Sequence, residues 1–200
     1  LSFTMLMAVG CSSTTQTTND TADTTQSTEQ TDTTSDVKTY NIATDTTFAP
    51  FEFSDENGNF VGIDIDIMEA IAQDQGFEVN WQVLGFNAAV QAVKAGQADG
   101  VIAGMSITEE RKLEHDFSDP YYDSAVVMAV GADNQEIQSY EDLAGKKVAV
   151  KVGTEGYNFA ESIKDQYGFE MVAFDDSNSM YQDVLVGNSV ACFEDYPVIA

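Results

Sequence analysis

Apolar positions in residues 37–200 recur with two periods, one typical of strands and one typical of helices. Strand-like runs are expected at 39–43, 78–84, 99–103, 147–152, 170–174 and 190–194. Helical spacing is found over 67–75, 86–94, 154–166 and 179–186. Strands that alternate with helices of this length indicate βαβ units and a mostly parallel sheet. Because one such series precedes the continuous apolar run 122–130 and another follows it, the pattern predicts an α/β protein with two lobes.

Shorter signals refine this pattern. Asn57-Gly58 lies between the apolar runs 51–53 and 60–61 and predicts a hairpin, with Asp55 in its turn. Asp66 is interpreted as the N-cap of the first helix, which Gly76 ends. Asp64 then falls just outside that helix and is interpreted as an exposed strand residue. Short helical turns are expected at 109–113 and 139–143.

The N-terminal segment differs from the rest of the chain. Residues 1–10 are largely apolar but fall far short of the roughly 20 residues that span a membrane, so they fit the remnant of a signal peptide. Ala8-Val9-Gly10-Cys11 resembles a bacterial lipobox, although Ala8 stands where Leu is usual. The expectation is a lipid on Cys11. The alternative is a frayed apolar terminus.

Residues 12–36 have the composition of a tether. Ala22 is their only apolar residue, and their acids have no basic residue among them. Such a segment cannot bury enough apolar surface to offset the entropy lost on ordering. Residues 11–36 are therefore predicted to be a lipid-anchored, disordered linker. A disordered tail without function is the alternative.

Net charge and residue counts exclude several functions. The chain carries 34 acidic and 8 basic residues, a net charge of −26. Nucleic-acid binding through phosphate neutralisation needs clustered Lys and Arg, so it is excluded, and anchoring by basic residues is disfavoured. His115 is the only histidine and Cys192 lies in an apolar run. We therefore expect no zinc cluster, no metal site and a buried Cys192.

Three strand-to-helix turns contain the candidate chemistry, at 43–53, 102–111 and 148–154. The second ends at Arg111, the only arginine of the chain, where a helix begins. Free amides at a helix N-terminus together with a guanidinium form a receptor for a carboxylate. Pairing of Arg111 with local acids such as Glu110 or Asp116 is an equal alternative.

These turns carry a family resemblance. Together with Gly62-Ile63-Asp64-Ile65-Asp66, Phe117-Ser118-Asp119-Pro120-Tyr121-Tyr122 and Asp195-Tyr196-Pro197, they resemble the polar amino-acid family of bacterial solute-binding proteins, which serve ABC importers. The segment ATDTTFAPFEF is most similar to glutamine-binding proteins.

The resemblance implies an overall organisation. It implies a two-lobed periplasmic-binding-protein-like fold (type II), with lobe 1 at 37–130 including a hinge strand, and an incomplete lobe 2 at 131–200. It also implies a monomer outside the cytoplasm that uses no cofactor, delivers its ligand to an ABC permease and catalyses no reaction.

The same resemblance assigns residues to the two charged groups of an amino acid. Arg111 would bind the α-carboxylate, assisted by Ser106 and backbone amides near Gly104. Asp195 would accept the α-ammonium. Ala103 is a further candidate in the same turn as Gly104.

Other positions would recognise the ligand's side chain. Phe48 and Phe86 would cover its aliphatic part, Asp45 and Lys151 would contact its end, and Thr154 would assist from the start of the third helix. A carboxylate at Asp45 repels glutamate, and the ammonium of Lys151 repels arginine or lysine. Glutamine is therefore the favoured ligand.

Three departures from the family pattern qualify this assignment. Glu194 replaces a histidine and would pair with Lys151, Val190 replaces an aspartate, and Glu155 replaces a small residue. Glu194 is both a further ligand-binding candidate and the best acid or base for the first alternative function, a dehydratase or cell-wall lyase of the same fold. The second alternative is the sensor domain of a longer receptor.

Overall fold

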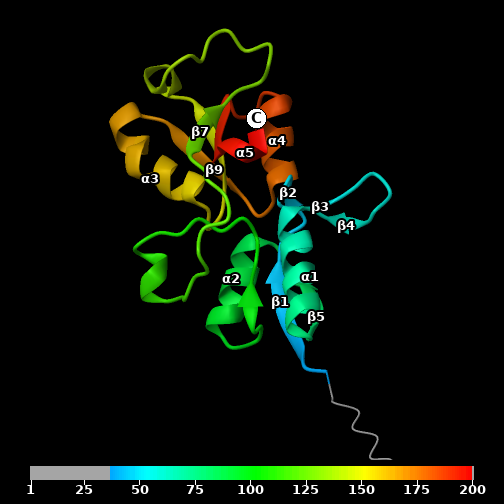
Figure 1. Ribbon diagram of the computed structural model, residues 1–200. Coiled ribbons are helices and arrows are strands. Elements are labelled where there is room, and N and C mark those ends of the chain that lie inside the picture. Colours follow the sequence, from blue (N-terminus) through cyan, green and yellow to red (C-terminus); the bar gives the residue numbers. More distant parts are fainter. Residues whose placement is uncertain (1–36, 200) are drawn as a thin grey trace, which may run out of the picture. The chain divides into compact units, whose positions relative to one another are not determined.

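Strand β1 (Thr39–Thr44) lies at the centre of the first sheet, and its last three residues, Ile42, Ala43 and Thr44, are buried. It pairs in parallel with β5 (Glu78–Val83) and with β6 (Gly100–Val101). Helices α1 (Ile63–Gln75) and α2 (Phe86–Lys94) lie alongside these strands in Figure 1. Ala43 packs against Ala89 and Ala92 of α2, and such small side chains allow helix and strand to approach closely.

The computed structural model describes residues 37–199, which lie in one compact unit of the chain. The signal-peptide remnant 1–10, Cys11 and the linker 11–36 lie outside the described residues, as does Ala200. The predictions made for them are therefore not addressed by the structure.

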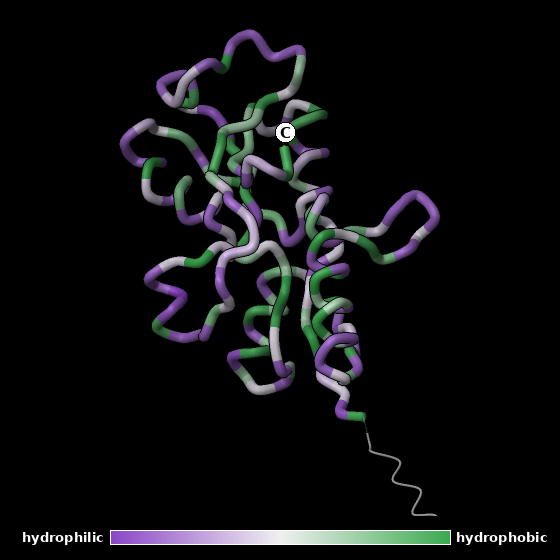
Figure 2. The backbone as a smooth tube through the Cα atoms, viewed as in Figure 1, coloured by the Kyte–Doolittle hydropathy of each residue, from purple (hydrophilic) through white to green (hydrophobic). Residues whose placement is uncertain are grey.

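A small antiparallel sheet follows β1. It consists of β2 (Thr47–Phe48), β3 (Glu52–Ser54) and β4 (Phe60–Val61). Asp55 organises the turn between β3 and β4 by accepting hydrogen bonds from the backbone of Asn57 and from both the backbone and side chain of Asn59, at 2.7–2.9 Å. The predicted hairpin is confirmed, and Figure 2 shows that its tip is hydrophilic.

The second sheet has the strand order β7-β10-β8-β9. The strands are β7 (Val126–Ala129), β8 (Lys147–Lys151), β9 (Glu170–Phe174) and β10 (Ala191–Asp195), and only the β7–β10 pair is antiparallel. Two longer helices cover this sheet, α3 (Glu155–Tyr167) and α4 (Ser177–Leu185). Short turns complete the elements: η1 (Arg111–Leu113), η2 (Tyr140–Leu143) and α5 (Tyr196–Ile199).

Alternation along β8 explains why α3 and α4 lie on opposite faces. Val148 and Val150 join the core cluster that includes Ala160 of α3, whereas Ala149 packs with Met180 of α4. Successive strand residues point to opposite faces of a sheet, so one strand supplies both cores. Cys192 lies in the α4 cluster and is buried, as predicted.

Two predicted elements are wrong in detail. Helix α1 begins at Ile63 and not at Ile67, because the amides of Ile63 and Asp64 bond to the carbonyls of Pro50 and Phe51 in the neighbouring hairpin. Gly62 makes this possible with φ 140°, where a side chain would collide with the Phe51 carbonyl. The run 122–130 forms a strand only over β7, and β7 joins the second sheet.

Within residues 37–199, no helix is both long enough and apolar enough to cross a membrane. The same range contains no group of three or more His, Cys, Asp or Glu side chains placed to hold a metal ion.

Candidate functional site

The loops that follow strands of the first sheet (β5-β1-β6) and of the second sheet (β7-β10-β8-β9) meet at one pocket. It is lined by Phe48, Phe86, Ala103, Gly104, Ser106, Arg111, Lys151, Thr154, Glu155 and Asp195. Sequence reasoning singled out all of these for ligand contact except Glu155. Two other candidates, Asp45 and Glu194, do not line the pocket, but each contacts a residue that does, Lys151 and Asp195 respectively. Carboxyl ends of strands are the usual place for ligands in such sheets.

Arg111 extends from η1 toward the start of α3. Its Nη1 donates to the Ser106 carbonyl at 2.8 Å and its Nη2 to the Gly153 carbonyl at 2.9 Å. Glu155 Oε1 lies 3.2 Å from Nη2 and forms an ion pair. Arg111 therefore pairs with an acid from the second sheet's helix and not with Glu110 or Asp116. Its guanidinium also lies over the Phe86 ring, 5.6 Å from the centroid.

The turn at Gly104 is closed on one side by Phe48. Gly104 has φ 53°, and a Cβ added there would lie 2.7 Å from Phe48 Cε1. Its amide donates to Asp64 Oδ2 at 2.6 Å, so this amide is bound within the protein. We expected amides near Gly104 to help bind a carboxylate, and the structure shows that the amide of Gly104 itself has another partner.

Asp45 and Lys151 form a buried ion pair beside Phe48. Lys151 is 1% exposed and Asp45 is 3% exposed. Lys151 Nζ also donates to Ser177 Oγ at 3.1 Å, while Asp45 Oδ1 accepts from the Thr46 amide at 2.6 Å. The two charges compensate each other, which is the condition under which such groups are buried.

Glu194 does not make the ion pair with Lys151 that the sequence suggested. Its carboxylate accepts from the Tyr181 hydroxyl at 2.8 Å and from the Asp195 amide at 3.0 Å. Lys151 instead contacts Asp45, across 106 residues of sequence. Burial raises the pKa of Glu194, whereas the hydrogen bonds from Asp195 and Tyr181 lower it.

Asp195 presents to the pocket a carboxyl whose pKa is raised above its ordinary value. Burial and then the charge of Glu194 raise its pKa to about 6, while Arg111 opposes the shift. A cation placed beside Asp195 would favour its ionised form. The pocket therefore combines a guanidinium with a carboxyl that gains from a neighbouring positive charge.

Sequence reasoning missed the buried acid behind Gly104. Asp64, interpreted as exposed, is fully buried in α1 and accepts from the Gly104 amide and, at 2.9 Å, from the Tyr121 hydroxyl. Asp64 and Ala72 are both buried and lie on the same face of α1, eight residues apart. A helix predicted to start at Ile63 would have included Asp64 on this face. The interpretation of Asp66 as the N-cap left Asp64 outside the predicted helix.

Comparison with known proteins identifies the family to which this chain is similar. Residues 40–187 match the model of the bacterial extracellular solute-binding proteins, family 3. The arginine-binding extracellular protein ArtP of Bacillus subtilis is 38% identical over 129 residues, covering 64% of this chain and 50% of that protein. The lysine/arginine/ornithine-binding periplasmic protein of Escherichia coli is 33% identical over 160 residues, covering 79% and 61%. The chain thus spans about half to three fifths of these curated relatives.

Solved structures give the same result. An ancestral arginine-binding protein bound to arginine has 39% identity and a TM-score of 0.76, covering 80% of this chain and 71% of that one. An ancestral arginine-binding protein bound to glutamine has 39% identity and a TM-score of 0.75, with the same coverage. These likenesses confirm the predicted two-lobed periplasmic-binding-protein-like fold. The chain belongs to the bacterial extracellular solute-binding proteins of family 3.

Proposed function

We propose that this protein binds one polar amino acid, glutamine, between its two lobes and delivers it to an ABC permease. One observation carries the proposal: Arg111 and Asp195 line the same pocket as Lys151, whose ion-pair partner is Asp45. An α-carboxylate matches the guanidinium, and an α-ammonium matches Asp195. A side-chain amide, which both donates and accepts, matches the Asp45–Lys151 pair.

The buried lysine supports glutamine over the cationic amino acids named for the relatives. An arginine side chain that reached Asp45 would lie beside the Lys151 ammonium. Two like charges about 4 Å apart at an effective dielectric constant of about 20 repel by about 4 kcal/mol. Glutamate would meet the Asp45 carboxylate, whereas an uncharged amide meets no like charge at either residue.

The arrangement around Glu194 supports binding without catalysis. A general acid or base needs a free proton-transfer position within hydrogen-bond reach of the substrate. Both oxygens of Glu194 accept hydrogen bonds from the protein, and the residue does not line the pocket. One solved relative, an ancestral amino acid-binding protein, is a precursor of cyclohexadienyl dehydratase, so an assay for turnover of a bound acid accompanies the binding assay.

The remaining parts of the proposal concern location. A family of extracellular solute-binding proteins works outside the cytoplasm. We propose that Cys11 is the lipid attachment point, that residues 12–36 form the tether, and that the protein acts as a monomer. Globomycin-sensitive processing and mass spectrometry of the membrane fraction would test the lipid on Cys11.

The binding proposal is tested by calorimetric and thermal-shift titration of the full chain with each of the twenty amino acids. We expect a response to glutamine and none to arginine. Arg111→Ala should weaken binding by at least about a hundredfold, because removal of one partner of a buried charged pair costs about 3–5 kcal/mol. Lys112→Ala, the exposed neighbour, is the matched control. Folded protein that responds to no amino acid would refute the proposal.

A further inference from the structure

Glu52 of β3 is a buried acid without a donor. Its side chain is fully buried, and within residues 37–199 neither of its carboxyl oxygens has a hydrogen-bond donor. Asp64, equally buried, accepts from the Gly104 amide and the Tyr121 hydroxyl. A buried carboxylate that accepts no hydrogen bond is costly, so the state of Glu52 needs an explanation.

The charges around Glu52 decide that state. The acids Asp64 of α1 and Asp45 after β1 face it, and so does the cation Lys151 of β8. Lys151 already neutralises Asp45. A charged Glu52 would therefore leave it and Asp64 as two adjacent anions away from water. Two carboxyls in contact share a proton under such conditions.

The contacts of the two acids favour a proton on Glu52 over one on Asp64. Burial, followed by the charge of Asp64 and hydrogen bonding to it, raises the pKa of Glu52 to about 10. Burial also raises the pKa of Asp64, but the Gly104 amide and the Tyr121 hydroxyl act against that shift. Asp64 has donors that stabilise its anionic form. Among the described residues Glu52 has none, and a proton on one of its oxygens would let it donate a hydrogen bond.

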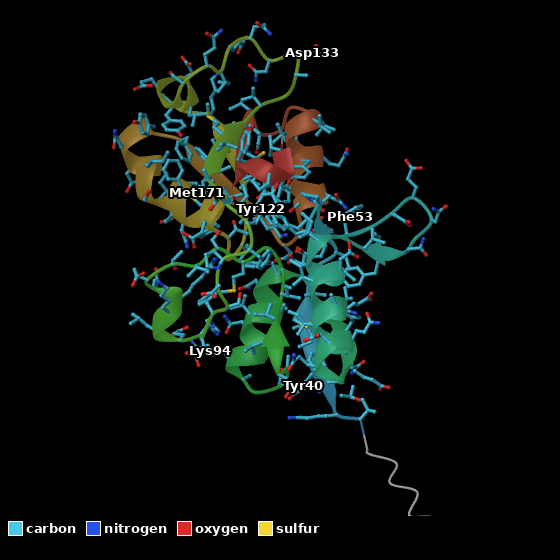
Figure 3. All side chains as sticks on the ribbon, viewed as in Figure 1. Tyr40, Phe53, Lys94, Tyr122, Asp133 and Met171 are labelled. Atoms are coloured by element: carbon cyan, nitrogen blue, oxygen red, sulfur yellow. The ribbon has the colours of Figure 1, made fainter. Side chains whose placement is uncertain are left out.

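We propose that Glu52 is a positioning residue: as a neutral carboxylic acid it donates a hydrogen bond to Asp64, and this acid pair fixes the Gly104 turn of the ligand pocket. The consequence for ligand binding rests on the function proposed above. Asp64 joins α1 to the Gly104 turn and to Tyr121, in the segment before β7. The neighbouring Tyr122, labelled in Figure 3, packs edge-on against Phe51, with the two ring centroids 5.1 Å apart. The hairpin, α1 and the pocket turn are thereby held together at one point.

Two substitutions of similar length separate hydrogen bonding from packing. Glu52→Gln keeps a donor for Asp64, whereas Glu52→Met fills similar space without one. Glu56→Gln, the same substitution in the exposed part of the same hairpin, is the control. The first readout is the amide signal of Gly104 in NMR spectra of the full chain, which requires no ligand. The second is the infrared band of a protonated carboxylic acid at pH 7.

We expect Glu52→Gln and Glu56→Gln to keep the Gly104 amide shift and its slow exchange, and Glu52→Met to lose both. The carboxylic-acid band should be weakened by Glu52→Gln and unchanged by Glu56→Gln. Equal behaviour of the Gln and Met variants, or no loss of band intensity in Glu52→Gln, would overturn the inference.

Titration with glutamine then connects the acid pair to the pocket. We expect Glu52→Met to weaken binding about tenfold and Glu52→Gln about twofold or less. Equal affinities of the two variants would refute the effect on binding. If the unmodified protein does not bind glutamine, the proposed function fails, but the Gly104 signal and the infrared band still decide whether Glu52 is protonated and positions the turn.

Discussion

Replacement of Lys151 by Met should exchange glutamine binding for arginine binding. Lys151 is buried, lines the pocket and pairs with Asp45. Methionine has a similar length but no charge, so the variant leaves the Asp45 carboxylate beside the pocket without its cation. Asp45 would keep its hydrogen bonds from Thr46 and Thr47 and could accept the guanidinium of a bound arginine.

The size of the exchange follows from these contacts. Loss of the charged hydrogen bond to the ligand amide costs about 1.5–3 kcal/mol, which weakens glutamine about 10- to 150-fold. Removal of the Lys151 ammonium removes its repulsion of a bound arginine guanidinium, which is up to about 4 kcal/mol. Even half of that gain would strengthen arginine binding about thirtyfold. The variant also leaves Asp45 unpaired, so its unfolding free energy should fall by roughly 3–5 kcal/mol unless arginine is bound.

Isothermal titration calorimetry with both amino acids measures the exchange directly. Lys147→Met, in the exposed first position of the same strand, is the control and should change neither affinity. The reasoning is refuted if Lys151→Met loses glutamine without gaining arginine, or if Lys147→Met shows the same exchange.

Three further predictions concern acids in and near the pocket. Glu155→Gln removes the carboxylate that competes with a ligand for Arg111 and should strengthen glutamine binding about two- to fivefold by calorimetry; weaker binding would contradict the competition. Because the pKa of Asp195 is raised to about 6, affinity should fall as pH drops from 7 to 5, and Asp195→Asn should show weak binding without this dependence. Folded Glu52 keeps a proton that the unfolded chain releases above its ordinary pKa of 4.5, so the unfolding free energy should fall as pH rises between 4.5 and about 10. The slope contributed by Glu52 approaches about 1.4 kcal/mol per pH unit, and urea unfolding of Glu52→Gln should lack that contribution.

Local patterns were sufficient to predict most elements of this fold. Helix α2 and strand β9 occupy the predicted residues, because each is bounded by a clear change of period. Helix α1 was predicted four residues too short because its first amides are satisfied by hairpin carbonyls and not by a side-chain cap. A cap of that kind depends on tertiary structure and leaves no local signal beyond Gly62.

The site was predictable in composition but not in its pairings. The resemblance of the strand-to-helix turns selected Arg111, Lys151 and their neighbours, which the structure gathers around one pocket. Which acid each cation contacts depends on how the two sheets meet, and Arg111 lies 44 residues from Glu155 in the sequence. The interpretation of Asp66 as an N-cap placed Asp64 outside the helix, and the buried carboxyl pair was missed with it.

The acidic composition has a consequence inside the protein as well as at its surface. Around the pocket the buried acids outnumber the cations, even though Lys151 and Arg111 each have an acidic partner. Exposed acids are solvated by water, but buried ones need either a donor or a proton. Burial raises the pKa of Glu194, Glu52 and Asp195 alike, but within residues 37–199 only Glu194 has donors to both of its carboxyl oxygens that act against the shift. An α-ammonium beside Asp195 would supply the positive charge that its environment lacks, so amino-acid binding below about pH 6 should release a proton from this residue.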